Sequence, residues 1–316
     1  MLNINYDIIM ENKSFAEVAA MWLLDKKPYI KQSTYCAYVL LLKNHILPAF
    51  AEIGEVTEEF VQTFVLEKLE HRLSQRTVKD MMMVLNMVLR YAVKHGYMLP
   101  FDMDIKYPQN PRVKGLDVFG IEEQKSIVKY VQTHFSFKSL GIYICLCTGL
   151  RIGEICALVW DDIDTQYGVI RVSKTIQRIY VVDGEDKYTK VIIDTPKSRN
   201  SSREVPIPKD LLDLISSLKN MVNGKSYVLT NTSHPIEPRA YRNYYNRLMK
   251  QLSLPPLKFH SLRHTFATRC IECKCDYKTV SMLMGHSNIS TTLNLYVHPD
   301  FEQKRRCVQL VYDTFL

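Results

Sequence analysis

Several separated segments in the second half of the chain carry side chains suited to phosphate chemistry. In TGLRIGE (148–154), a Thr-Gly turn opens a helix whose first turn carries Arg151, with Glu154 three residues later. A helix N-terminus attracts anions, and an arginine there adds a bidentate fork for phosphoryl oxygens that Glu154 can hold in place. An isolated Arg–Glu pair on a helix is more often an exposed ion pair without a function, so this segment alone does not indicate a phosphate site.

The other segments add proton-transfer groups and a nucleophile. TPKSRNSSREVPIP (195–208) puts Lys197 in a hairpin turn, where it could protonate a departing alkoxide. HSLRHT (260–265) puts His260 and Arg263 on one face of a helix, as a proton-transfer group beside a second phosphate clamp. MGHSNISTTLNLYVH (284–298) contains His286 and Tyr296; a tyrosine attacks phosphorus only where the phosphoryl charge is stabilised, and most of the 19 tyrosines must be structural.

The order of these segments and their local sequences strongly resemble those of the tyrosine recombinase family, the phage-type integrases. The resemblance spans residues 148–298, and HSLRHT, LMGHSN and STTLNLY are its most specific parts. It implies six catalytic residues, with Glu154 supporting them: Arg151, Lys197, His260, Arg263, His286 and Tyr296.

The resemblance also implies a role for each residue. Arg151 and Arg263 would hold the nonbridging oxygens of the scissile phosphate, with His286 as a further donor. Lys197 would protonate the leaving 5′ oxygen, and His260 would assist proton transfer. Tyr296 would form a 3′-phosphotyrosyl link that conserves the bond energy, so strand exchange would need no ATP, metal or other cofactor.

Helical periodicity dominates the N-terminal third of the chain. Tyr35, Tyr38, Val39, Leu42 and Ile46 form one apolar stripe that is expected to stop before Pro48, and Ser74 is a good N-cap for a long helix toward Gly96. The pattern predicts a helical core-binding domain over residues 1–104. A proline-containing, aperiodic stretch at 105–118 is predicted to be the linker.

The remainder, 119–316, is predicted to be a mixed α/β catalytic domain. Helices are expected near 121–133, 137–147, 152–159, 209–221, 238–252, 260–273, 276–284, 289–297 and 300–315. Segments 168–177, 190–195 and 203–208 are predicted to form one three-stranded antiparallel sheet. The first hairpin is lengthened by 178–190, where Lys187 and Lys190 could contact a DNA backbone. The fold class is therefore mainly α with a small antiparallel sheet.

Charge is divided unevenly along the chain. Residues 1–106 hold 12 Lys and Arg against 13 Asp and Glu, whereas the rest holds 29 against 20. This surplus suits a polyanion such as nucleic acid, although a solvated basic face would look the same. Residues at helix starts and in the Lys197 turn are expected to contact DNA: Lys31, Thr34, Arg76, Thr77, Lys79 and Arg199.

Location and metal content follow from composition. No apolar run approaches the length of a membrane helix and the N-terminus does not resemble a signal peptide, so a cytoplasmic protein with free thiols is expected. Cys270, Cys273 and Cys275 lack the second pair that a zinc site needs, so no metal is predicted. Periodic helices begin near residue 14, which favours a simple recombination site over a large complex built with an additional arm-binding domain.

The expected partner is duplex DNA with paired half-sites, on which the chain would assemble as a tetrameric synapse, with an accessory directionality factor as a further possibility. Cys307, Leu310, Val311, Thr314 and Phe315 form an apolar stripe on a terminal helix at 300–316, which either docks on its own domain or is exchanged with a neighbouring subunit. Such an enzyme would serve a mobile element, DNA inversion or resolution. Two alternatives are a type IB topoisomerase and a non-catalytic DNA-binding regulator on the same fold.

Overall fold

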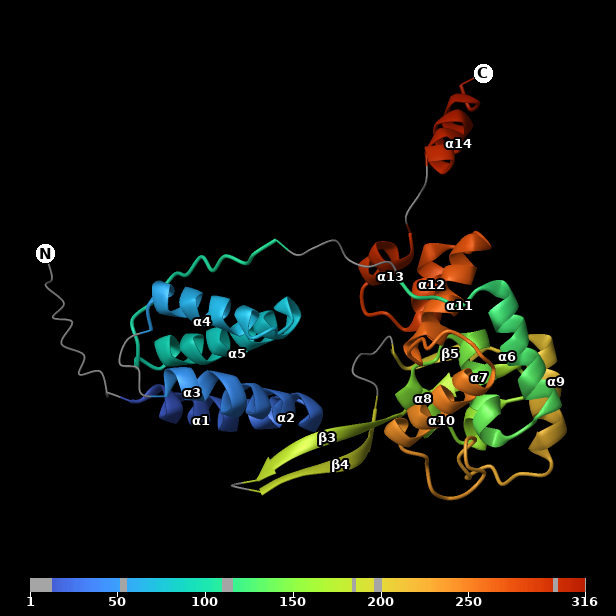
Figure 1. Ribbon diagram of the computed structural model, residues 1–316, viewed down its shortest axis with the longest axis horizontal. Helices are drawn as coiled ribbons and strands as arrows, with labels where there is room; N and C mark the ends of the chain where they lie inside the picture. Colours follow the sequence, from blue (N-terminus) through green and yellow to red (C-terminus); the bar gives the residue numbers. More distant parts are fainter. Residues whose placement is uncertain are drawn as a thin grey trace, which may run out of the picture. The chain divides into compact units, whose positions relative to one another are not determined.

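A computed structural model describes residues 13–51, 56–109, 116–183, 186–195, 201–297 and 301–315. The chain divides into two compact units (Figure 1): an N-terminal unit of Met1–Lys114 with Ile179–Lys190, and a C-terminal unit of Gly115–Arg178 with Val191–Leu316. Helices predominate and the strands are few, so the predicted fold class is confirmed. None of the helices within those described ranges is long and apolar enough to cross a membrane.

The helices of the N-terminal unit begin where the sequence supplies caps. Ser14 forms a capping box at the start of α1, and Ser74 accepts a hydrogen bond from the Thr77 backbone N–H at the start of α5, which confirms the predicted cap. The elements are α1 (Phe15–Lys26), η1 (Lys27–Tyr29), α2 (Gln32–Leu41), η2 (Leu42–Ile46), α3 (Leu47–Phe50), α4 (Glu58–Glu70) and α5 (Gln75–Lys94).

The helix that carries the Tyr35–Ile46 stripe does not stop before Pro48, so that prediction was wrong. η2 is a π-type turn in which the Leu47 N–H bonds to Leu42 O, and α3 then continues to Phe50 with Pro48 in its first turn. The wider turn shifts the hydrogen-bond register just before the proline, which has no N–H to donate. Leu42 and Ile46 are buried, as the stripe predicts.

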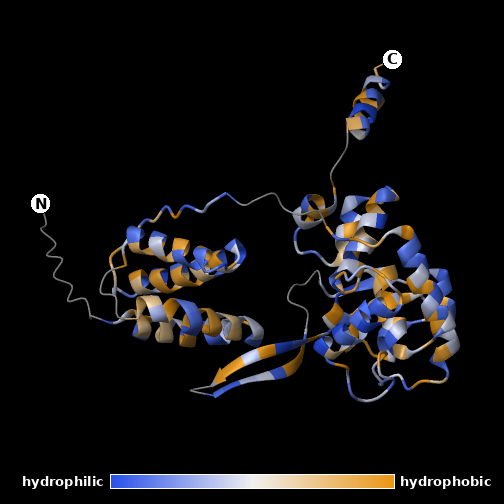
Figure 2. Cartoon of the chain, in the orientation of Figure 1, coloured by the Kyte–Doolittle hydropathy of each residue, from blue (hydrophilic) through white to orange (hydrophobic). Residues whose placement is uncertain are grey.

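Aromatic rings fill the core of the N-terminal unit. Phe50 lies 5.1 Å from both Phe60 and Phe64, measured between ring centroids, in edge-on arrangements, and Trp22 is fully buried nearby in the same cluster. Figure 2 shows hydrophobic and hydrophilic residues alternating along α4 and α5, as expected for amphipathic helices.

The first part of the predicted linker packs on the N-terminal unit. Gln62 exchanges two hydrogen bonds with the Lys106 backbone (3.0 and 2.9 Å), and Gln75 donates to Pro108 O (2.9 Å). Residues 110–115 lie outside the described ranges. The helical unit therefore continues past the predicted boundary at 104.

The predicted three-stranded sheet has the wrong membership. The sheet of the C-terminal unit has the order β1 (Ile163–Asp164), β2 (Val169–Val172), β5 (Arg203–Pro206), and Ile170 pairs with Val205. The 190–195 segment belongs instead to a separate two-stranded ribbon of β3 (Thr175–Asp183) and β4 (Asp186–Asp194). Alternation identified the strands but says nothing about which edges pair, so the second strand was assigned to the wrong sheet.

The helices of the C-terminal unit lie close to the predicted ranges. α7 is buried on almost every side, and Tyr241, Tyr245 and Trp160 complete the core around it. The elements are α6 (Ile121–Thr133), α7 (Phe137–Thr148), α8 (Ile152–Ala157), η3 (Trp160–Asp162), α9 (Lys209–Lys219), α10 (Pro238–Gln251), α11 (His260–Glu272), α12 (Tyr277–Met284), α13 (Ile289–Tyr296) and α14 (Phe301–Tyr312).

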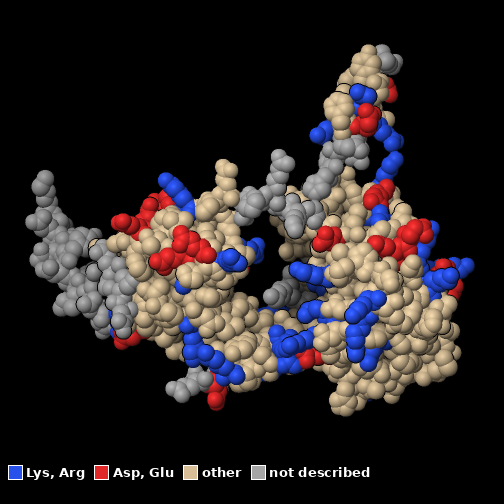
Figure 3. Space-filling model, in the orientation of Figure 1, with Lys and Arg blue, Asp and Glu red and all other residues tan. Residues whose placement is uncertain are grey.

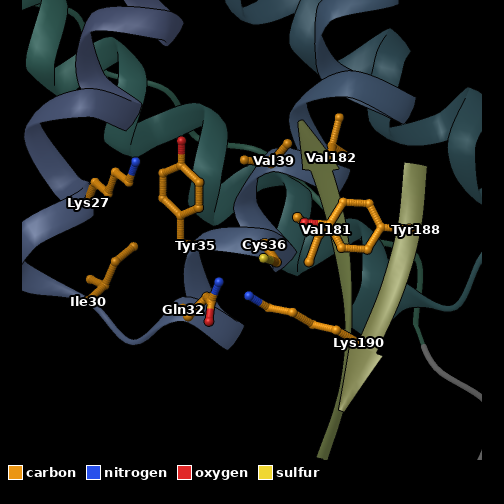
Figure 4. Close-up of a pocket in the computed structure, with 10 residues that line it drawn as sticks. All are labelled: Lys27, Ile30, Gln32, Tyr35, Cys36, Val39, Val181, Val182, Tyr188 and Lys190. Atoms are coloured by element: carbon orange, nitrogen blue, oxygen red, sulfur yellow. The ribbon is translucent and has the colours of Figure 1, made fainter. Parts of the chain in front are cut away.

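The far end of the β3–β4 ribbon belongs to the N-terminal unit and lines a pocket there with α2. Figure 4 shows Lys190 of β4 pointing toward Gln32 and Cys36, with Tyr188 and Val181 beside them. Burial raises the pKa of the Cys36 thiol, and the Lys190 ammonium only partly opposes this. Of the two lysines expected to contact DNA, Lys190 is thus half-buried at this pocket, and Lys187 is exposed.

The apolar stripe of the terminal helix is exposed. Leu310, Val311 and Phe315 on or just beyond α14 keep 56%, 58% and 75% of their surface accessible. Both predicted arrangements of this helix, docking on its own domain and exchange with a neighbouring subunit, stay predictions.

Candidate active site

Arg151 is held at the start of α8 by a carboxylate and a carbonyl. Gly149 ends α7 in the left-handed conformation (φ 66°), where an added Cβ would lie 2.6 Å from Phe266, so the turn requires glycine. Arg151 then donates from Nη1 to Glu154 Oε1 (2.8 Å) and from Nη2 to Gly285 O (3.0 Å). Its side chain remains one-third exposed, so it can meet a ligand from solvent.

Arg263 is the buried partner of Arg151. It lies in the first turn of α11, is 1% exposed, and donates to Gly149 O (2.6 Å) and to Met284 O. Burial and the positive charge of Arg151 lower its pKa, and the two carbonyls offset the loss of water. Both arginines therefore take their positions from the C-terminal ends of α7 and α12.

Glu154 links a third arginine to this pair. Arg203 of β5 donates from both terminal nitrogens to Glu154 (3.0 and 3.1 Å) and from Nε to Leu283 O (2.6 Å). Burial alone would raise the pKa of Glu154, but the hydrogen bonds and charges of Arg203 and Arg151 hold it below its usual value. The carboxylate is thus ionised and fixes two guanidinium groups.

Two imidazoles lie beside the arginines and are neutral at physiological pH. Desolvation and the charges of Arg263 and Arg151 lower the pKa of His286 to about 4, and its Nδ1 lies 2.8 Å from Thr292 Oγ1. The pKa of His260 is also lowered, by desolvation and by His264 and Arg263, although the residue as a whole is exposed. A neutral imidazole donates a hydrogen bond from one nitrogen and can accept a proton at the other, whereas a guanidinium has donors only.

Tyr296 is the last residue of α13, and the charges of Arg151 and Arg263 act on its hydroxyl. The side chain is only 8% exposed, and its Oη lies 2.6 Å from His264 Nδ1. Burial raises its pKa, while the charges of Arg263 and Arg151 oppose the rise. By contrast, Tyr241 and Tyr245 are buried with their hydroxyls donating to Lys138 O and Leu257 O, so they are structural.

The arrangement is suited to an in-line attack on a phosphodiester. Fixed positive charge from two arginines can stabilise a pentacoordinate phosphoryl group, and a tyrosine hydroxyl is placed where that charge acts. Within the part of the chain that the structure describes, no three His, Cys, Asp or Glu side chains are grouped so as to hold a metal ion. Cys273 and Cys275 are exposed and Cys270 is half-buried.

Comparison with known proteins identifies the family. The profile described as "Phage integrase family" matches residues 120–303, more than half of the chain. The chain belongs to the phage integrase family, the tyrosine recombinases. The profile "Phage integrase, N-terminal SAM-like domain" matches residues 14–69 of this integrase-family chain.

Relatives and solved structures of the integrase family cover most of the chain. A XerC-like tyrosine recombinase from Caldanaerobacter subterraneus subsp. tengcongensis is 30% identical, and the ICEBs1 integrase of Bacillus subtilis is 26% identical; each match covers 90% of this chain and 79% of the relative. The Tn1549 transposon integrase in complex with a circular intermediate DNA is 23% identical with a TM-score of 0.76, over 94% of this chain and 99% of that one. A lambda integrase tetramer bound to a Holliday junction is 16% identical with a TM-score of 0.62, over 92% and 80%.

Most of the predicted catalytic set of this integrase-family chain lies together. The charges of Arg151 and Arg263 act on His260, His286 and Tyr296, and Glu154 accepts a hydrogen bond from Arg151. Lys197 and Arg199 lie outside the described ranges.

Two residues beside the site were missed from the sequence. Arg203 falls in the predicted strand 203–208, and its partner Glu154 is 49 positions away, so no local signal reveals the contact. For His264 the available signal is its i, i+4 spacing from His260, which places both rings on one helix face.

The residues expected to contact DNA in the N-terminal unit are on its surface. The Arg76 side chain is 86% exposed, and its Nε lies 3.4 Å from Asp80 Oδ1. Lys79 is exposed, and its ammonium lies 4.9 Å from the centre of the Tyr107 ring. Thr77 is half-buried at the start of the same helix. Lys31 precedes α2, which contains Thr34, and both side chains are half-buried. Figure 3 shows patches of Lys and Arg on both units of this integrase-family chain.

Proposed function

We propose that this tyrosine recombinase cuts and rejoins duplex DNA of a mobile element, with Tyr296 as the nucleophile. The observation that carries the proposal is the buried Tyr296 hydroxyl beside the Arg151–Arg263 pair. The names of the relatives support the mobile-element role, since they include the ICEBs1 integrase and the Tn916 transposase. They do not favour DNA relaxation or a non-catalytic regulator.

The two arginines bind the nonbridging oxygens of the scissile phosphate. Each guanidinium has five N–H donors, and the contacts named above engage two on each. His286 adds a further donor at the same phosphate. As negative charge develops on phosphorus, these donors are already in position, which lowers the barrier without reorganisation.

Tyr296 Oη attacks the phosphorus and the 5′ oxygen leaves. Lys197, in the segment between β4 and β5, protonates that oxygen, while His260 assists proton transfer near the phosphate. The product is a 3′-phosphotyrosyl ester, and attack on it by a 5′ hydroxyl reverses the step. Because the ester conserves the bond energy, no external energy source is needed.

DNA is bound by both parts of the chain. The core-binding domain (1–104) contacts phosphates and base edges through Lys31, Thr34, Arg76, Thr77 and Lys79, and the catalytic domain (119–316) adds Arg199. The linker (105–118) connects the two domains. Solved integrases of the same fold in complex with DNA support this partner. A soluble, cytoplasmic location fits an enzyme that acts on a mobile element.

The recombining unit is a tetramer on paired half-sites. The exposed apolar side chains of α14 need a partner surface, and donation of residues 300–316 to a neighbouring subunit would supply one. The lambda integrase tetramer on a Holliday junction supports this assembly for the shared fold. A directionality factor could select between integration and excision.

A nicked suicide duplex tests the nucleophile. The duplex is built from the inverted repeats that flank the element encoding this chain, with a nick that releases the leaving strand. We expect an SDS-resistant adduct with the unaltered protein and with Tyr244→Phe, and none with Tyr296→Phe, which should still bind. An adduct that survives in Tyr296→Phe, or maps to Tyr241 or Tyr245, would overturn the assignment.

A further inference from the structure

Tyr296 has a hydrogen-bond partner that the proposed chemistry leaves without a role. His264 lies on α11, one helical turn after His260, and its Nδ1 is 2.6 Å from Tyr296 Oη. The two ring centroids are 5.7 Å apart and the ring planes are inclined by 49°. This is the distance of a short hydrogen bond to the atom that attacks phosphorus.

The two arginines whose charges act on Tyr296 cannot accept its proton. Arg263 and Arg151 influence the phenol through their charge, and a guanidinium has donors but no acceptor. The imidazole of His264 has a lone pair on whichever nitrogen is unprotonated. When that nitrogen is Nδ1, the Tyr296 hydroxyl donates to it.

The surroundings of His264 favour the neutral form that a base requires. Desolvation and the adjacent Arg263 lower its pKa. The ring of His260 meets it edge-on at 4.5 Å between centroids, and His286 is near enough to interact with it electrostatically. Tyr296 faces His264 from helix α13. The charge of Arg263 and the loss of water disfavour a positive charge on His264, so its imidazole is neutral and keeps a lone pair at neutral pH.

We propose that His264 is the general base that takes the phenolic proton of Tyr296 during DNA cleavage and returns it during ligation. This rests on the proposed function, because it needs Tyr296 as the nucleophile. In cleavage the Oη–P bond forms and the proton passes to His264 Nδ1. The P–O5′ bond breaks, its electron pair stays on the 5′ oxygen, and that oxygen takes a proton from the separate acid, Lys197.

Ligation uses the same groups in reverse. The 5′ hydroxyl attacks phosphorus and gives its proton back to Lys197, while the Oη–P bond breaks. The imidazolium of His264 then protonates the departing phenolate, which restores Tyr296 and the neutral ring. His264 is therefore a catalytic residue in contact with the reacting atom, and the ring of His260 packs edge-on against the ring of His264.

The test compares His264→Gln and His264→Leu with the unaltered protein on the suicide duplex under single-turnover conditions. A glutamine can still hold the hydroxyl but cannot take its proton, so both variants should cleave about 10²–10⁴-fold more slowly. The acid limb of the pH–rate profile, where His264 becomes protonated, should disappear in His264→Gln. The matched control is His134→Gln, an exposed histidine of the same unit, which should cleave at the unaltered rate.

Two chemical substitutions separate the base from its alternatives. Fluorotyrosine at position 296 has a more acidic phenol, so it should speed cleavage by His264→Gln far more than cleavage by the unaltered protein. A 5′-bridging phosphorothiolate, whose leaving group needs no protonation, should rescue Lys197→Ala and leave the His264→Gln defect unchanged. If both His264 variants have lowered melting temperatures, fluorotyrosine at position 296 of the otherwise unaltered protein still tests the proposal. If His264 is the base, the acid limb of the pH–rate profile should stay at the same pH, because the histidine and not the phenol sets it.

The outcomes are distinct. If His264→Gln cleaves within about threefold of the unaltered rate and keeps the acid limb, His264 only positions Tyr296 and the proposal is wrong. Phosphorothiolate rescue of His264→Gln would assign His264 to the leaving group, which also overturns it. Failure of the proposed function would look different, since the unaltered protein would then form no Tyr296 adduct.

Discussion

Replacing Arg203 by methionine tests whether the buried carboxylate organises the site. Methionine keeps much of the apolar volume but removes both donors to Glu154 and the donor to Leu283 O. The side chains of Arg203 and Glu154 are 7% and 2% exposed, so water cannot replace the lost partner. Glu154 would keep Arg151, which is one-third exposed and already bound to it.

The expected loss of stability can be worked from these contacts. Breaking a buried ion pair by removing one partner costs about 3–5 kcal/mol, and the remaining bond to Arg151 places this case near 3 kcal/mol. For a domain of this size, that corresponds to a fall of about 6–12 °C in the melting temperature of the C-terminal unit. The matched control is Arg171→Met, which removes a half-exposed arginine paired with Asp164 and Glu204 and should lower the stability far less, because water replaces the lost partner.

The pH dependence of this loss has a definite sign. In the unaltered protein the folded-state pKa of Glu154 is below its unfolded value of 4.5, so its contribution is complete above that pH and is lost as the pH falls through the folded pKa. Without Arg203, burial raises the pKa of Glu154. The difference between Arg203→Met and the unaltered protein should therefore be largest at pH 7 and shrink toward pH 4.

Urea titrations of the two proteins at pH 7 and pH 4 provide the measurement. Near-ultraviolet circular dichroism follows the buried aromatic side chains of both units, and the transition that differs between the two proteins is that of the C-terminal unit. A deficit at pH 7 no larger than that of Arg171→Met would refute the reasoning. So would a deficit that grows as the pH falls.

Three other predictions concern cleavage and assembly. Adduct formation should persist in excess EDTA, because the arginines supply the positive charge; loss of activity restored by Mg²⁺ or Zn²⁺ would contradict this. Half-site affinity measured by gel shift should fall steeply with salt if the basic residues from 107 onward meet phosphates; a flat dependence would place them away from DNA. Truncation after Lys304 should leave the melting temperature and single half-site binding nearly unchanged but abolish cooperative filling of paired sites; loss of single-site affinity would mean that α14 supports its own domain.

Local patterns account for what could be predicted from the sequence. The helices that begin near Arg151 and end at Tyr296 are capped by Glu154 and Asn288, so their positions follow from the residues nearby, whereas α11, which carries His260, begins without a side-chain cap. The roles expected for those residues came from the order of the motifs. Each piece of information lay within a short window of the chain.

Features that depend on distant pairing could not be predicted in the same way. The 190–195 strand has the right alternation but pairs with β3 rather than with β2, because register and partner are set by packing. The Arg203–Glu154 contact joins β5 to α8, and neither residue differs locally from an ordinary surface charge. His264 gains a role only when α13 brings Tyr296 to its ring.

The way the arginines are held explains how the site keeps a strong positive charge. Arg151, Arg203 and Arg263 donate to Gly285 O, Leu283 O, and Gly149 O with Met284 O, and all four carbonyls lie at the C-terminal ends of α7 and α12. Carbonyls at helix C-termini carry partial negative charge and need donors, so each contact satisfies both sides. If carboxylates stood where these carbonyls are, they would neutralise the positive charge of the arginines, which a bound phosphate requires. With Glu154 as the one carboxylate in these contacts, the arginines are fixed in place and their net charge remains available to the DNA backbone.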